Sequence, residues 1–162
     1  MKRPDLIPTK ICSAVEAARR VAGWRINGKK VAFTNGVFDL LHRGHIFSLS
    51  GAAAEADYLV VGVNGDDSVK RLKGPGRPVH GEQERAMVLA SLEIVDLVVL
   101  FNEDTPIELI KLLLPDVLVK GGDYTVENIA GASEVINAGG RVVINPLLEG
   151  FSTSSTIEKL RG

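Results

Sequence analysis

Short apolar runs recur along the chain, and longer stretches with helical spacing separate them. The run at 58–63 is continuously apolar apart from one glycine, which is typical of a parallel strand covered on both faces. We predict strands at 30–34, 58–63, 96–100, 117–120 and 141–144. We predict helices at 13–21, 46–56, 82–92, 106–114, 129–138 and 152–160.

The alternation of strand and helix predicts the fold class. Such units are joined by right-handed crossovers, which give a parallel sheet with helices on both faces. The expected architecture is a single α/β domain with a Rossmann-like, doubly wound sheet of about five parallel strands. We separate an N-terminal helical segment at 1–27 from the main domain at 28–162, and expect a long polar loop at 64–80.

The stretch after the first strand is the strongest candidate for chemistry, because such sheets bind ligands at the carboxyl ends of their strands. It reads Thr34-Asn-Gly-Val-Phe-Asp-Leu-Leu-His-Arg-Gly-His45. Its two histidines are three residues apart, so on a helical turn they share one face. A helix N-terminus with two imidazoles favours a bound phosphate, because ring and backbone N–H groups can donate to its oxygens. A zinc pair is disfavoured, since His80 is the only other histidine and no cysteine lies nearby.

Together with later segments, this stretch resembles the signature of the cytidylyltransferase-like nucleotidyltransferases, whose mark is His-x-Gly-His after the first strand. The later segments are Lys70 and Lys73, the pair Glu84-Arg85, the run at 119–124 and the run at 149–154. Within that superfamily, the combination of 33–45 with 119–124 is most similar to the heptose 1-phosphate adenylyltransferases. The resemblance covers residues 28–161, so the main domain is expected to be the nucleotidyltransferase domain.

The resemblance implies a reaction between ATP and D-glycero-β-D-manno-heptose 1-phosphate. The products would be pyrophosphate and ADP-heptose, for lipopolysaccharide or another surface glycan. The attacking phosphate is already an anion, since the second pKa of a phosphate monoester is about 6, so no general base is required. The implied catalytic residues are His42, His45 and Lys73, which would offset phosphate charge. Mg²⁺ would accompany ATP and keep several waters, so no protein side chain is assigned to the metal.

The resemblance also assigns two sets of binding residues. The expected nucleotide-binding residues are Asn35, Gly36, Val37, Phe38, Gly44, Arg85, Gly121, Asp123, Gly150, Ser152, Thr153 and Ser154. The expected residues for the sugar phosphate are Asp39, Asn64, Asp66, Lys70 and Lys120.

Several of these residues also have a plainer interpretation. Charge alone would place Lys70 and Lys73 in a solvated loop. Asp39 could cap the following helix, and Arg85 could pair with Glu82 on a helix surface. The hydroxyls at 152–156 could cap the final helix, which is compatible with phosphate binding.

Two other functions stay open. A CTP-dependent cytidylyltransferase acting on glycerol 3-phosphate or a related alcohol phosphate would keep the same fold. Enzymes of that kind carry an arginine where this chain has Leu147, which weighs mildly against this function. A non-catalytic nucleotide-binding module would not need the lysine for an attacking phosphate. The glycine patterns of dinucleotide-binding enzymes and P-loop NTPases are absent around the first strand.

Composition and charge exclude some classes of protein but do not indicate a function. The chain has 162 residues, of which 45% are apolar and 24% charged, as in an ordinary globular domain. Its net charge of −1 does not favour nucleic acid as a partner, and no apolar stretch approaches the roughly 18 residues of a membrane span. The lone Cys12 excludes an internal disulfide, so a reducing, cytoplasmic location is expected. We expect a homo-oligomer and, because the chain is too short to contain a sugar kinase, a separate heptose kinase upstream.

Overall fold

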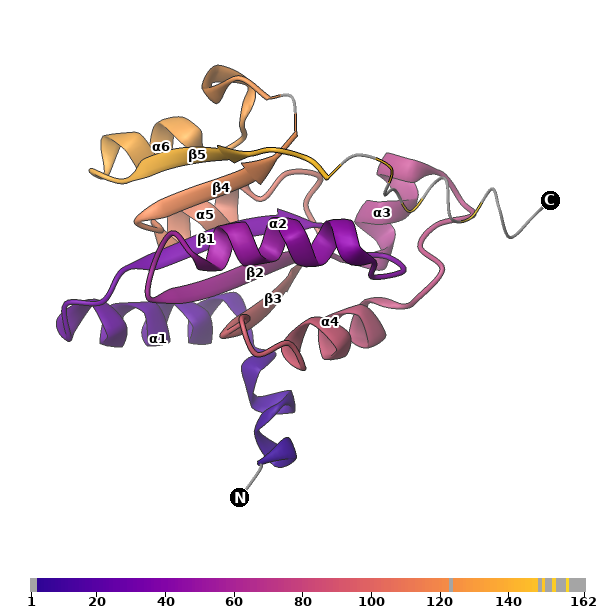
Figure 1. Ribbon diagram of the computed structural model, residues 1–162, viewed down its shortest axis with the longest axis horizontal. Helices are drawn as coiled ribbons and strands as arrows, with labels where there is room; N and C mark the ends of the chain where they lie inside the picture. The colour runs from indigo at the N-terminus through magenta and orange to yellow at the C-terminus, as the bar shows by residue number, and fades with distance from the viewer. Residues whose placement is uncertain (1–2, 123, 149, 151–152, 154–156, 158–162) are drawn as a thin grey trace.

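The computed structural model describes residues 3–122, 124–148, 150, 153 and 157. Within them, five parallel strands form one sheet with helices on both faces (Figure 1). The strands are β1 (Val31–Gly36), β2 (Tyr58–Asn64), β3 (Leu97–Phe101), β4 (Val117–Gly121) and β5 (Arg141–Asn145). Their order is β3-β2-β1-β4-β5, so the winding reverses between β1 and β4. The predicted α/β doubly wound fold is confirmed.

The helices cover the sheet in two layers. They are α1 (Ala14–Ile26), α2 (Arg43–Ala53), α3 (Asp66–Lys73), α4 (Glu82–Ala90), α5 (Ile107–Leu113) and α6 (Ala132–Asn137). The described residues also form three short 3-10 turns, namely η1 (Pro4–Leu6), η2 (Pro8–Lys10) and η3 (Val126–Asn128).

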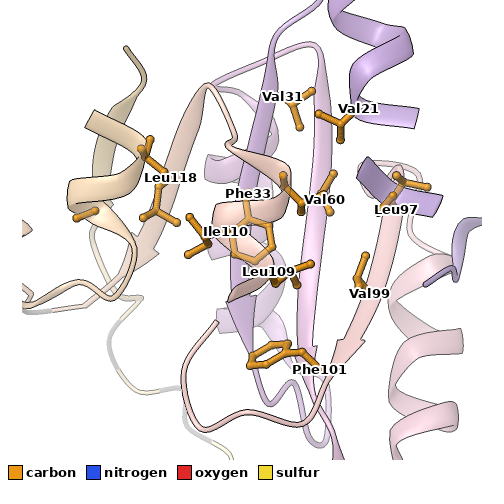
Figure 2. Close-up of a cluster of buried hydrophobic side chains, with 14 of the residues drawn as sticks. Val21, Val31, Phe33, Val60, Leu97, Val99, Phe101, Leu109, Ile110 and Leu118 are labelled. Carbon is orange, nitrogen blue, oxygen red and sulfur yellow. The ribbon is translucent and has the colours of Figure 1, made fainter. Parts of the chain in front are cut away.

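Each face of the sheet has its own buried apolar cluster, because successive strand side chains point to opposite faces. Phe33 of β1 joins the cluster under α1, α5 and α6, which Figure 2 shows from the side chains of Val21, Ile110 and Leu118 among others. Its neighbour Ala32 joins the second cluster, under α2 and α4. The two clusters fix the sheet between the helix layers and so fix the positions of its strand ends.

The N-terminal segment packs onto this core. Ser13 caps α1 by accepting a hydrogen bond from the Glu16 N–H, and the helix continues past the predicted end at residue 21 to Ile26. Ala17 and Val21 are completely buried against the sheet. The segment is therefore part of the same core, and the boundary between 27 and 28 stays a prediction.

The predicted loop at 64–80 is wrong, because α3 occupies its first half. Acidic residues open this helix and basic residues close it, which suits the helix dipole, and Val69 is fully buried. Gly74 ends the helix with a φ of +94°, a conformation that suits glycine. The largely polar composition concealed the helix, so Lys70 and Lys73 lie on a helix rather than in a loop.

Other predicted helix boundaries shift by a few residues. Helix α2 begins at Arg43 rather than at 46, and α6 begins at Ala132 rather than at 129, since a turn at 129–131 separates it from η3. Pro106, and not Thr105, occupies the N-cap of α5. Most of the predicted helix at 152–160 lies outside the described residues. Within the described part of the chain, no helix is both long and apolar enough to cross a membrane.

Candidate active site

The candidate site lies where the winding of the sheet reverses. The carboxyl ends of β1 and β4 are neighbours there, and ligands of doubly wound folds bind at such a point. The Lys120 Nζ atom at the end of β4 donates a hydrogen bond to the Asn35 Oδ1 atom of β1, at 3.3 Å. Two residues predicted from different segments are therefore in contact.

The two histidines form the N-terminal turn of α2. His42 is the N-cap, and its Nδ1 atom accepts a hydrogen bond from the Gly44 N–H at 3.1 Å. The Nδ1 atom of His45 accepts in turn from the His42 N–H at 3.3 Å, and the two rings stack with centroids 3.9 Å apart. Because each Nδ1 atom is an acceptor, the neutral rings carry their protons on Nε2. The predicted shared face is confirmed, and the histidines replace the usual Ser and Glu of a capping box.

The surroundings keep both rings neutral. Burial, together with the nearby charge of His42, lowers the pKa of His45 to about 4, although Asp39 acts in the opposite direction. Burial also lowers the pKa of His42. At neutral pH the pair therefore consists of hydrogen-bond donors without a net charge.

Lys120 is a partly buried cation. Burial lowers the pKa of its ammonium group, and the Nζ atom lies 5.5 Å from the centre of the Tyr124 ring. Among the described residues, no carboxylate forms an ion pair with it. An anionic ligand would offset the unfavourable burial of this charge.

A cavity of about 190 Å³ joins the histidine turn to the segment after β5. It is lined by His42, Gly44, His45, Ser48, Leu147, Leu148 and Thr153. At Gly121 a Cβ atom would lie 3.4 Å from the Ser48 hydroxyl, so the end of β4 closely approaches the same helix face. The structure thus brings together four predicted residues, His42, Gly44, His45 and Thr153. The predicted Gly150 follows β5 in a left-handed turn, and Asp123, Ser152 and Ser154 lie outside the described residues.

A second hollow, of about 400 Å³, borders His42. Its lining residues are Phe38, Leu40, Leu41, His42, His80, Glu84, Arg85 and Val88. The sequence did not predict that His80 lines this hollow or that Ser48 lines the first cavity. Helical spacing could have found Ser48, since it lies three residues after His45. No local pattern marks His80.

Arg85 links three segments around the site through buried hydrogen bonds. Its guanidinium group is buried and donates to the carbonyl oxygens of Val37, Asn64 and His80, at 2.6 to 3.0 Å. It also forms an ion pair with Asp66 at 2.8 Å. Glu82, the alternative partner, instead accepts a hydrogen bond from the Asp66 N–H. The Asn64 side chain is likewise used internally, because its amide donates to the Ser68 hydroxyl.

The turn between β1 and α2 is tightly folded. A Cβ atom on Gly36 would lie 3.1 Å from the Phe38 ring, so glycine favours the close approach of this ring. Phe38 then packs against His45, with ring centroids 5.5 Å apart. Asp39 does not cap α2, because His42 does.

The two predicted lysines of α3 lie apart from the histidine cavity. Lys70 pairs with Asp67 at 3.4 Å and lines a polar hollow between the N-termini of α3 and α4. Lys73 lies exposed in the last turn of α3 and does not line the histidine cavity. Their predicted contacts with phosphate stay predictions.

The described residues contain no group of three or more His, Cys, Asp or Glu side chains that could hold a metal ion. The Nδ1 atoms of the stacked histidines already accept backbone hydrogen bonds. These two ring nitrogens are therefore engaged within the protein.

Comparison with known proteins supplies the family. A family model described as cytidylyltransferase-like matches residues 33–159. The chain belongs to the cytidylyltransferase-like family. This match contains the histidine turn, both cavities and the segment after β5, and it confirms the resemblance predicted from the sequence.

Curated relatives in this family are bifunctional proteins named HldE. That of Caulobacter vibrioides is 58% identical over 151 residues, which are 93% of this chain and 31% of the relative. That of Paramagnetospirillum magneticum is 56% identical over 164 residues, which are 100% of this chain and 34% of the relative. The chain thus spans about a third of the length of these curated relatives.

Two solved structures are similar. A lipopolysaccharide core biosynthesis protein from Thermoplasma volcanium is 30% identical with a TM-score of 0.60, over 75% of this chain and 98% of that one. A pantoate-beta-alanine ligase from Francisella tularensis has a TM-score of 0.57 over 93% of this chain and 76% of that one. The second structure is only 14% identical and shares the fold alone.

Proposed function

We propose that this chain transfers an adenylyl group from ATP to D-glycero-β-D-manno-heptose 1-phosphate, giving ADP-heptose and pyrophosphate. The observation that carries this proposal is the cavity in which the neutral pair His42 and His45 meets Thr153 of the segment after β5. The two ring donors face a segment from the C-terminal part of the domain there, and transfer between two phosphates requires such preorganised donors. Similarity to the HldE proteins and to a lipopolysaccharide core biosynthesis protein supports a sugar phosphate as the acceptor.

The reaction would be an in-line substitution at the α-phosphorus of ATP. An oxygen of the sugar phosphate forms the new P–O bond, and the bond to the oxygen that bridges the α- and β-phosphorus breaks. Pyrophosphate leaves with the electron pair. Because the attacking phosphate is already ionised, no residue needs to remove a proton.

The residues of the chain would stabilise the charge that spreads over the phosphate oxygens. His42 and His45 would donate from their Nε2 atoms, and the N-terminal N–H groups of α2 would add the field of the helix dipole. Lys120 would bind a phosphate oxygen, which would give its ammonium group an ionic partner in the complex. Mg²⁺ bound to ATP would neutralise part of the triphosphate charge.

The remaining predicted contacts belong to this proposal. They comprise Lys73 at the attacking phosphate and the predicted binding residues other than Asp39, Asn64 and Arg85, whose side chains form internal hydrogen bonds instead. We also propose that residues 28–162 form the nucleotidyltransferase domain, that a heptose kinase supplies the sugar phosphate, and that the protein is a cytoplasmic homo-oligomer.

The test is pyrophosphate release with Mg²⁺, in which ATP and CTP are each combined with heptose 1-phosphate and with glycerol 3-phosphate. We expect release only with ATP and heptose 1-phosphate. Release with CTP and glycerol 3-phosphate would instead support the cytidylyltransferase. Nucleotide binding without release in any combination would favour a binding module. Reactions without acceptor are the control for simple hydrolysis.

A further inference from the structure

Asp39 lies three residues before His42, in the turn that leads from β1 into α2. Its side chain is 0% exposed. A carboxylate in such a place is unfavourable unless its oxygens are bonded and its charge is paired. The contacts of Asp39 therefore indicate what the residue does.

Both carboxylate oxygens bind the segment that joins α3 to α4. Oδ2 accepts hydrogen bonds from the Arg77 Nε and the Val79 N–H, each at 2.9 Å, and Oδ1 accepts from the His80 N–H at 3.1 Å. Burial acts to raise the pKa of Asp39, but these hydrogen bonds outweigh it and lower the pKa below its usual value. Asp39 is thus an ionised clamp on residues 77–80, and Arg77, with a side chain 16% exposed, supplies the opposite charge.

The backbone around Asp39 is held in an unfavourable conformation. Phe38 and Leu40, on either side of it, have φ values of 50° and 49°, which residues with a Cβ rarely adopt. The Asp39 carbonyl oxygen accepts a further hydrogen bond from the Thr153 hydroxyl at 2.9 Å. One residue therefore anchors the strained turn to the segment before α4 and to the segment after β5.

We propose that Asp39 is a positioning residue for the adenylyl transfer: with Arg77 it fixes the turn that sets the places of His42 and His45. The expected effect of this positioning on the reaction rate rests on the proposed function. Phe38 of the same turn packs on His45, while His42 and His80 line one hollow, so a relaxed turn would move the ring donors. A misplacement of about 1 Å in a catalytic group can lower a rate about 100-fold.

The kinetic test is Arg77→Ala, which leaves the two backbone hydrogen bonds to Asp39 in place. We expect kcat to fall about 10- to 100-fold, while KM for ATP changes less than about threefold, because the altered donors act mainly in the transition state. Arg77→Lys, which keeps a cation beside Asp39, should recover part of the lost kcat. The matched control is Arg141→Ala, which breaks an Arg–Glu ion pair of 2.7 Å with Glu55 at the opposite edge of the sheet.

A second measurement separates this inference from the proposed function. Ring-nitrogen NMR signals of the two histidines, and hydrogen exchange at the Val79 and His80 amides, can be recorded without substrate. We expect shifted ring signals and faster exchange in Arg77→Ala and smaller changes in Arg77→Lys, but neither in Arg141→Ala. If the wild-type protein releases no pyrophosphate, the proposed function fails and these signals still decide the positioning role. Unchanged ring signals in both Arg77 variants, or a wild-type kcat in Arg77→Ala, would overturn it.

Discussion

Lysines at the ends of the strands have different partners at the two edges of the sheet. At the amino edge, Lys29 pairs with Asp57 and Lys30 with Asp116, each at 3.0 Å. The pairing raises the pKa of Lys29, and the pKa of Asp57 is lowered by a hydrogen bond from the Lys30 N–H and by the contact with Lys29. At the carboxyl edge, burial lowers the pKa of Lys120, and no described carboxylate pairs with that lysine. Lysines at the amino edge are thus paired with carboxylates, whereas Lys120 at the carboxyl edge is not paired with any described carboxylate.

We expect this difference to separate stability from function. The lysines of these ion pairs at the amino edge are about half or more exposed, and such pairs add little to the free energy of unfolding. At the carboxyl edge the histidine pair and Lys120 have pKa values shifted by burial, a property common at functional sites. A bound phosphate would supply a negative charge beside Lys120.

The largest effect is expected from His45→Asn. The Asn side chain can still accept the hydrogen bond from the His42 N–H, so the start of α2 should persist, but the ring donor is lost. We expect kcat for pyrophosphate release to fall about 10²- to 10³-fold, as when one donor to a transition-state oxyanion is removed. Lys29→Gln at the amino edge is the control and should keep the wild-type kcat. A wild-type kcat in His45→Asn would show that the reaction does not need the ring donor at the carboxyl edge.

A smaller effect is expected from Lys120→Met, which removes the charge and retains the length of the side chain. We expect the rate to fall about 10- to 100-fold, because one contact with a phosphate is lost. Stability should stay the same or rise, since a partly buried cation is removed. Lys30→Met at the amino edge should do the reverse, with unchanged rate and slightly lower stability. Urea unfolding and pyrophosphate assays on both variants check this, and equal rate losses would contradict it.

Lowering the pH should reduce the free energy of unfolding through His45 at the carboxyl edge. Its pKa is about 4 in the folded protein and 6.5 in a model peptide, so the neutral ring stabilises the fold fully above pH 6.5. This contribution is lost as the pH falls from 6.5 toward 4, because the unfolded chain then binds a proton on the His45 ring and the folded protein does not. Between pH 7 and 4.5 the wild-type protein should lose about 1–2 kcal/mol more than His45→Asn, allowing for partial solvent screening. Urea unfolding at the two pH values measures the difference, and equal losses would show that the ring is not held neutral.

The sequence predicted the fold and part of the site for physical reasons. Continuous apolar runs such as 58–63 identify buried parallel strands, and the spacing of His42 and His45 identifies a shared helix face. Helix α3 was missed because its buried side consists of little more than Val69 and Ser68, which give a weak apolar pattern.

The internal roles of Arg85 and Asp39 could not be predicted. Arg85 bonds the carbonyl of Val37, 48 residues earlier in the chain, and Asp39 bonds Arg77, 38 residues later. Local spacing contains no information about such partners. A charged residue beside a catalytic motif therefore looks the same in the sequence whether it contacts a ligand or holds a loop.

The smallest effect concerns the amino edge alone. In Asp116 one carboxylate oxygen accepts from the Val31 N–H at 3.0 Å, and the other binds Lys30. Burial acts to raise the pKa of Asp116, but these contacts and Arg25 lower it overall. Asp116→Asn can keep the bond to the backbone and loses only the charge, so we expect about 1 kcal/mol less stability and an unchanged kcat. A fall in kcat without a matching loss of stability would mean that the two edges are coupled through β1 and β4, and the separation of stability from function would not hold.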